Sequence, residues 1–281
     1  MLLLVLPTIG AGVVLQTHWW GVNLPAVAWW TVGLSVLLGL VAWKLRTATP
    51  WAAVSGALIT ASLTFSTTVF PYSPWRTALV PLLTLLVLTS LATRLGRRRK
   101  ESLGTGEARH GRAAAQVAAN LGVAALVSSE MVQSALTTSG WFPGSAAATT
   151  VVFSVGLAAL AESAADTVSS ELGQVLGGTP RMITTLRKAE PGTDGAISLV
   201  GTFAGIAAAV LVALAGALSL GGGAVMFWIA CGAGTFGLFF DSLLGATLER
   251  RGWLNNDAVN FLSTVSSAAF AVILLAAVFR K

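Results

Sequence analysis

Two acidic residues, Glu162 and Asp166, lie four positions apart, where a long apolar run that starts at Ala146 comes to an end. On a helix this spacing puts both carboxylates on one face, and Ser169 and Ser170 continue close to that face. Carboxylate and hydroxyl oxygens are the ligands that a hard divalent cation such as Mg²⁺ prefers. The pattern therefore indicates a metal site. Two alternatives stay open: hydrogen bonds between helices, or a helix end already in water.

The stretch of residues 173–202 is rich in glycine and proline, which interrupt helices, and basic residues are interspersed in it. Within it, the sequence PGTDG at 191–195 leads into an apolar segment. A glycine-containing turn at a helix N-terminus offers unpaired N–H groups and the positive end of the helix dipole, which together bind phosphate. We therefore expect a phosphate site here. The alternative is that Thr193 or Asp194 is an ordinary helix cap.

A third polar block follows Asp241, which interrupts the apolar run GTFGLFFDSLLGATL. An isolated acid in such a run is by default a hypothesis of a functional site. Asn256, Asp257 and Asn260 open the last apolar segment, although Asn256 alone is also explained as a helix cap. Asn120, in an earlier segment, has the same polar character. Together, the carboxylates, cations and bent backbone of these blocks resemble a site for Mg²⁺ and a polyphosphate at a membrane surface.

The elements that must position these residues are membrane helices. The chain has 281 residues, of which 55% are hydrophobic and only 10% charged, and its mean hydropathy is +0.79. A soluble domain has about 25% charged residues, and the continuous, non-alternating apolar runs exclude a β-barrel. The single cysteine excludes an internal disulfide, and the two histidines share no motif. The sequence therefore predicts an all-α, polytopic transmembrane helix bundle.

The apolar runs predict about nine spans, at roughly 1–17, 24–43, 51–70, 76–95, 113–138, 145–170, 196–220, 223–247 and 257–279. Loops after the even-numbered spans hold most of the basic residues, so they are expected to face the cytoplasm together with the N-terminus. This orientation places the active site on the cytoplasmic side of a plasma or inner membrane. The basic loops are then expected to contact anionic lipid, and binding of nucleic acid is not expected.

The acids divide the chain, since none occurs before Glu101. Residues 1–96 are expected to be scaffold helices, 97–112 a basic cytoplasmic linker in water, and 113–281 the catalytic bundle.

Five blocks in this order resemble the integral membrane family that includes phytyl-phosphate kinase: GRAAAQVAANLGVAAL, AESAADTVSSELG, PRMITTLRKAEPGTDGAISLVGT, DSLLGATLERRG and LNNDAVNFLST. The resemblance covers roughly residues 111–265, and it extends distantly to the dolichol and phytol kinases. It implies transfer of the γ-phosphoryl group of CTP, or of another nucleoside triphosphate, to an isoprenyl monophosphate such as phytyl or geranylgeranyl phosphate. The implied partners are the nucleotide, the lipid substrate and membrane lipids.

The resemblance also implies roles for single residues. The Mg²⁺ ligands would be four acids: Glu162, Asp166, Asp241 and Asp257. The catalytic residues would be Asp166, Asp241 and Arg181. The residues that bind the nucleotide would be Lys188, Gly192, Thr193, Asp194, Gly195, Ser198, Asn120, Asn256 and Asn260.

The acceptor phosphate is already anionic, so the implied reaction needs no strong general base. Two other functions stay open on the sequence: a secondary transporter, which also places acids and broken helices in a membrane, and a lipid-binding membrane protein without catalysis.

Overall fold

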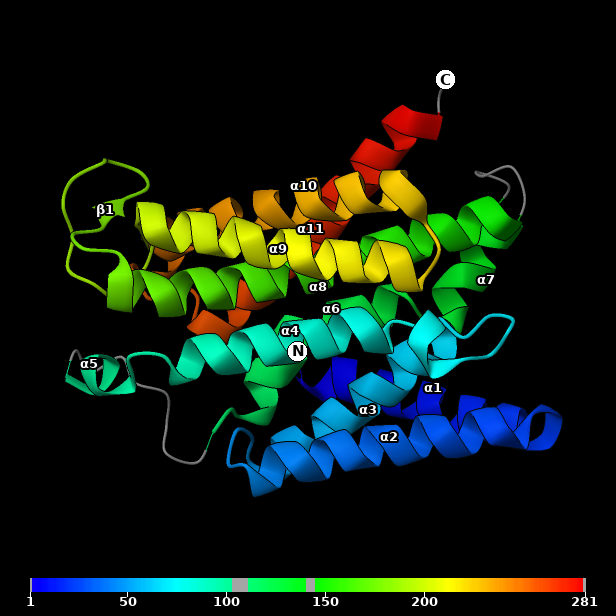
Figure 1. Cartoon of the computed structure of the whole chain (residues 1–281). Helices are drawn as coiled ribbons and strands as arrows, with labels where there is room; N and C mark the ends of the chain where they lie inside the picture. The colour runs from blue at the N-terminus through cyan, green and yellow to red at the C-terminus, as the bar shows by residue number, and fades with distance from the viewer. Residues whose placement is uncertain (1, 103–110, 140–144, 280–281) are drawn as a thin grey trace.

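The computed structural model describes residues 2–102, 111–139 and 145–279 of the chain, and most of them are helical (Figure 1). The elements, in chain order, are α1 (Leu2–Asn23), α2 (Pro25–Lys44), α3 (Pro50–Ser66), η1 (Pro74–Arg76), α4 (Leu79–Arg94), α5 (Arg97–Ser102), α6 (Ala114–Val127), α7 (Glu130–Thr138), α8 (Ser145–Leu176), β1 (Arg181–Met182), β2 (Ala196–Ile197), α9 (Leu199–Ser219), α10 (Gly223–Leu244), η2 (Gly245–Glu249) and α11 (Asn256–Phe279).

The predicted class is confirmed, since seven helices of the described chain are long and apolar enough to cross a membrane when α6 and α7 are taken together as one span. Two of the nine predicted spans are shorter: α3 has 17 residues and α4 has 16. The predicted span 113–138 is interrupted after Val127, because the backbone at Ser129 is extended and a new helix, α7, begins at Glu130. The predicted span 145–170 is longer than expected, because α8 continues to Leu176.

Helix α8 lies at the centre of the bundle and packs against α4, α6, α9, α10 and α11 (Figure 1). In its apolar window 83% of the residues are buried, the highest share among the seven long helices. Small residues allow this packing. A Cβ added to Gly201 or Gly205 of α9 would lie 2.7 Å from the carbonyl oxygen of Ser169 or Ala165, respectively. Such small-residue faces let membrane helices approach closely.

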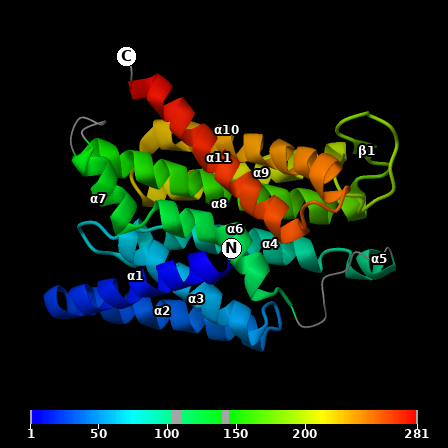
Figure 2. The same ribbon diagram turned by 180° about the vertical axis from the view of Figure 1, so that it is seen from behind.

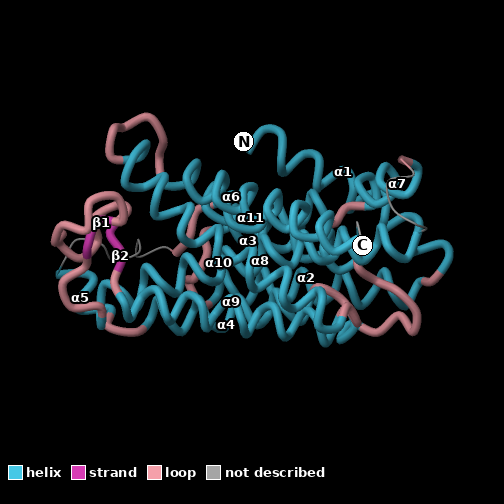
Figure 3. Tube along the Cα trace, turned by 90° about the horizontal axis from the view of Figure 1, so that it is seen from above, coloured by secondary structure: helices cyan, strands magenta, loops and turns pink. Residues whose placement is uncertain are grey.

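The basic loops lie at one end of the bundle. Helix α5, the β1–β2 hairpin and the turn between α10 and α11 are on the left in Figure 1, and Figure 3 shows α5 and the two strands at the same end of the bundle. The strands are antiparallel, with Arg181 opposite Ile197. From the same end, α11 crosses the bundle diagonally to the C-terminal end at the opposite side (Figure 2). This arrangement agrees with the alternation of basic and non-basic loops in the sequence.

Candidate functional site

A polar cavity of about 350 Å³ opens at the basic end of the bundle. Its walls come from the start of α6, the second half of α8, the hairpin segment 177–198, the end of α10 with η2, and the start of α11. Five acidic residues and one arginine line it: Asp166, Glu171, Asp194, Asp241, Glu249 and Arg112. We call it the carboxylate cavity.

The carboxyl groups of Asp166 and Asp241 lie next to each other, within hydrogen-bonding reach, although they come from different helices. Asp241 occupies the last turn of α10, and Asp166 faces it from α8. The guanidinium of Arg112 is close enough to attract the carboxylate of Asp166. The fold thus brings two of the four predicted metal ligands, Asp166 and Asp241, into one cavity.

The pair has the chemistry of a divalent cation site. Asp241 Oδ1 is buried and accepts no hydrogen bond from the described part of the chain. Two adjacent carboxylates repel each other unless positive charge lies between them. Among the described residues no group of three histidine, cysteine or acidic side chains is arranged to hold a metal by itself. Mg²⁺ is commonly bound through only one or two carboxylates, with waters and substrate phosphates completing its shell, and this pair offers two carboxylates.

The turn PGTDG lines the cavity, but it is not the start of a helix. Strand β2 follows it, and α9 begins only at Leu199, capped by Ser198 Oγ, which accepts a hydrogen bond from Gly201 N at 3.1 Å. Neither Thr193 nor Asp194 is therefore the cap. The positive end of the helix dipole lies at Ser198 and Leu199 instead of directly after the turn. The intervening strand accounts for the difference, because it pairs residues 196–197 with β1.

A close backbone contact holds the turn in place. Gly195 has a φ of +72°, and a Cβ there would lie 2.2 Å from Ala246 N, in the first turn of η2. Only glycine fits both the left-handed conformation and this contact. Segment η2 is a π-helical turn, and π-turns are often found at functional sites. Through it, Glu249 reaches the cavity wall.

Three asparagines complete the cavity wall: Asn120, Asn256 and Asn260. The capping alternative for Asn256 is wrong, since the residue before it has that role. Asn255 Oδ1 accepts a hydrogen bond from Ala258 N at 2.9 Å.

Four predicted site residues do not line the carboxylate cavity. Glu162 is 1% exposed and lies deeper, where α8 meets Gly237 of α10. Asp257 is half-buried at the start of α11. Arg181 and Lys188 are exposed, and their backbones form an antiparallel β-bridge in the hairpin. Arg181 Nη1 donates a hydrogen bond to the carbonyl of Leu186 at 2.9 Å. Their proposed roles stay predictions.

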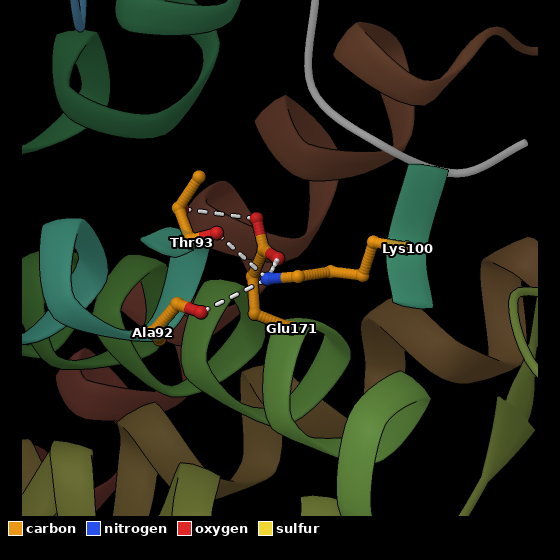
Figure 4. A network of polar contacts seen from close by, with 4 residues as sticks. All are labelled: Ala92, Thr93, Lys100 and Glu171. Carbon is orange, nitrogen blue, oxygen red and sulfur yellow. Dashed lines mark hydrogen bonds and ion pairs between the residues drawn. The ribbon is translucent and has the colours of Figure 1, made fainter. Parts of the chain in front are cut away.

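The predicted linker 97–112 is not simply a solvated charge run, although residues 103–110 lie outside the described ranges. The side chain of Lys100 is only 3% exposed and forms a salt bridge with Glu171 of α8 at 2.5 Å. Lys100 Nζ also donates to the carbonyls of Ala92 and Thr93 at the end of α4, and Thr93 donates to Glu171 at 2.9 Å (Figure 4). Both oxygens of Glu171 are therefore engaged in joining helices.

The cavity wall includes charged residues, among them Arg112 and Glu249, that the sequence does not predict as site residues. The sequence predicts Arg112 only as a charge of the basic linker. It lies two residues before α6, so no helical spacing relates it to Gln116 and Asn120 of the same cavity wall. The placement of Arg112 depends on its backbone hydrogen bonds to Thr47 and Thr49, and that of Glu249 depends on the π-turn, so neither has a signal in the local sequence.

The helices and the polar cavity define a polytopic membrane protein with a buried charged site near one surface. The chain belongs to a family of such proteins: the model of the integral membrane protein family DUF92 matches residues 33–268, which is most of the chain. The match reaches further toward the N-terminus than the five motifs, and it includes the second half of α2 and all of α3 and α4.

Three relatives illustrate the range of the family. An uncharacterized membrane protein of Methanocaldococcus jannaschii is 41% identical over 120 residues, which cover 42% of this chain and 49% of the relative. An uncharacterized membrane protein of Synechocystis is 32% identical over 232 residues, covering 80% and 81%. The chloroplastic protein VTE6 of Arabidopsis thaliana is 29% identical over 196 residues, covering 67% and 55%. The matched part is thus about half of the archaeal and plant relatives. No solved structure matches the chain.

Proposed function

We propose that this protein is a membrane kinase that transfers the γ-phosphoryl group of CTP, or of another nucleoside triphosphate, to an isoprenyl monophosphate. The product is the isoprenyl diphosphate. The observation that carries the proposal is the adjacent pair Asp166 and Asp241 in a polar cavity that also holds Arg112 and three asparagines. Membership of the DUF92 family, the similarity to VTE6 and the five ordered motifs support it further.

Phosphoryl transfer requires positioning and neutralisation of charge more than covalent chemistry from the protein. Asp166 and Asp241 would hold Mg²⁺, which when bound neutralises charge on the phosphate oxygens. Arg112 offers a guanidinium for two parallel hydrogen bonds to a phosphate, and the side-chain amides of Asn256 and Asn260 offer further donors.

The reaction forms one bond and breaks one. An oxygen of the acceptor phosphate bonds to the γ-phosphorus, and the bond from that phosphorus to the oxygen shared with the β-phosphate breaks. The nucleoside diphosphate leaves with that oxygen. Since the attacking oxygen is already anionic, no side chain has to remove a proton.

The test is a transfer assay with the purified protein, Mg²⁺ and CTP labelled in the γ-position. Phytyl, geranylgeranyl and farnesyl phosphates serve as acceptors, and ATP, GTP and UTP replace CTP in parallel. We expect the label in an isoprenyl diphosphate. A folded protein that labels none of these acceptors from any of the four nucleotides would contradict the proposal. Uptake of an anionic solute into proteoliposomes without product formation would favour a transporter instead.

A further inference from the structure

A second cavity, of about 430 Å³, lies between the N-terminal helices α2, α3 and α4 and the helices α6 and α8. Its volume is within the range of about 300–1,000 Å³ that is usual for ligand pockets. The body is apolar, with walls that include Leu38, Ala53, Leu82, Leu85 and Leu121. We call it the amphipathic cavity, because its residues at the basic end of the bundle are charged.

The charge of the amphipathic cavity is opposite to that of the carboxylate cavity. Five cations line it, namely Arg46, Arg94, Arg97, Lys100 and Arg112, against two carboxylates, Glu101 and Glu171. Both carboxylates are already paired: Glu101 with Arg97 at 2.9 Å, and Glu171 with Lys100. A cavity with an apolar body and an excess of cations at one end is complementary to an amphipathic anion.

The two cavities share part of one wall. Arg112, Asn120 and Glu171 line both of them. An anionic head group near Arg112 would therefore lie beside the carboxylate cavity, where we propose that the γ-phosphate is positioned. The apolar tail of the same molecule would lie in the amphipathic cavity.

The N-terminal helices fix this shared wall through the backbone of Arg112. Its N–H donates to the carbonyl of Thr47, and its carbonyl accepts from Thr49 N, both at 3.0 Å, in the turn between α2 and α3. The preceding residue, Gly111, has a φ of +79°, and a Cβ there would lie 2.4 Å from the Thr47 backbone. Glycine alone permits this contact. The helices predicted to be scaffold thus position a residue of the site.

We propose that the amphipathic cavity binds the acceptor lipid as a single-chain lipid phosphate, with its hydrocarbon tail among α2, α3 and α4 and its phosphate toward Arg112. This inference rests on the proposed kinase function for the role of acceptor. The binding itself does not depend on it.

Gly56 offers a precise probe of the cavity, because a Cβ added there meets nothing within 4 Å and the residue lines the cavity wall. Gly56→Phe would extend an aromatic side chain from this wall, starting at a Cβ position that no neighbouring atom crowds. Gly33→Phe is the matched control, since a Cβ at this exposed glycine of α2 also meets nothing within 4 Å and Gly33 lines neither cavity.

The experiment measures direct binding of labelled geranylgeranyl phosphate to the protein in detergent without nucleotide, and KM for the same lipid in the transfer assay. Gly56→Phe is expected to raise both Kd and KM at least about tenfold, in line with the discrimination that an apolar pocket achieves. KM for CTP should be unchanged, and Gly33→Phe should behave as wild type. Arg94→Gln should weaken binding of the lipid, whereas Arg98→Gln, outside both cavities, should not.

Two competitors identify the recognised chemistry. Geranylgeraniol, which lacks the phosphate, and inorganic phosphate, which lacks the tail, should each compete at least about tenfold less well than the lipid phosphate. Competition by inorganic phosphate as strong as that by the lipid would overturn the assignment of a lipid site.

The outcomes separate the two proposals. Transfer with an unchanged lipid Kd and KM in folded Gly56→Phe protein would overturn the assignment of this cavity and leave the kinase proposal intact. Binding that Gly56→Phe weakens, without transfer by the wild type, would support the lipid site and contradict the kinase. Absence of lipid binding by the wild type would overturn the inference.

Discussion

At the scale of single residues, the two adjacent carboxylates of Asp166 and Asp241 are poorly explained by a purely structural role. Acidic side chains inside membrane spans are costly and are usually paired with a cation or a polar group. Here two of them face each other, and Asp241 Oδ1 has no hydrogen-bond donor in the described ranges. A structural role would favour a donor at that position, whereas binding of a cation favours a bare oxygen.

Exchange of either aspartate for asparagine tests this difference. Asp166→Asn and Asp241→Asn keep the side-chain volume but remove the charge that would offset the metal and phosphates. Phosphoryl transfer is expected to fall at least about a hundredfold, on the order of 3 kcal/mol in the barrier, while thermal stability in detergent is kept or rises.

The control for these variants is the double change Arg98→Gln and Arg99→Gln, at two exposed positions that line neither cavity. It should leave turnover within a few fold of the wild type. Asparagine variants that lose stability but retain full specific activity would assign the aspartates to helix packing instead.

The salt bridge between Lys100 and Glu171 leads to a prediction about stability. Lys100→Met should lower the free energy of unfolding by roughly 3 kcal/mol, because removing one partner leaves the other as an uncompensated, mostly buried charge. The loss is checked by thermal unfolding in detergent. The double variant Lys100→Met/Glu171→Met should recover part of it. A double variant less stable than either single variant would show that the ion pair is not the cause.

At the scale of elements, the contact between α8 and α9 depends on the absence of side chains. Gly205→Ala should lower stability by about 1–3 kcal/mol, the usual cost of overpacking, because its Cβ would overlap the carbonyl of Ala165. On an exposed helix face, replacing glycine by alanine normally raises stability. Gly33→Ala on α2, where nothing lies within 4 Å, should therefore be neutral or stabilising. Equal melting temperatures for the two variants would contradict the packing role.

The elements also show what the sequence could and could not predict. Apolar runs and helical spacing were sufficient to predict the bundle and to place Asp166 on a helix face, because both depend on local periodicity. Contacts between distant segments were not accessible. The burial of Lys100 requires α5 to meet α8, since Lys100 and Glu171 are 71 positions apart along the chain. The cap at Ser198 instead of Thr193 requires β2 to pair with β1.

At the scale of the whole molecule, the basic loops at one end predict the orientation in the membrane. In a Cys231→Ala background, single cysteines at the exposed positions Arg98, Thr185 and Arg251 should react with an impermeant thiol reagent only from the cytoplasmic side. A cysteine at Trp75, between α3 and α4, should react only from outside. Labelling of any of the first three positions from outside would contradict this orientation.

The π-turn at Gly245–Glu249 has one further consequence, which concerns the rotational phase of the chain that follows. A π-turn contains one residue more than the corresponding α-turn, and one residue corresponds to about 100° of rotation about the helix axis. Deletion of Thr247 would let the segment return to regular α-helical hydrogen bonding. Glu249 would then point away from the cavity wall. The extra residue thus sets the angle at which Glu249 and the turn before α11 leave the end of α10.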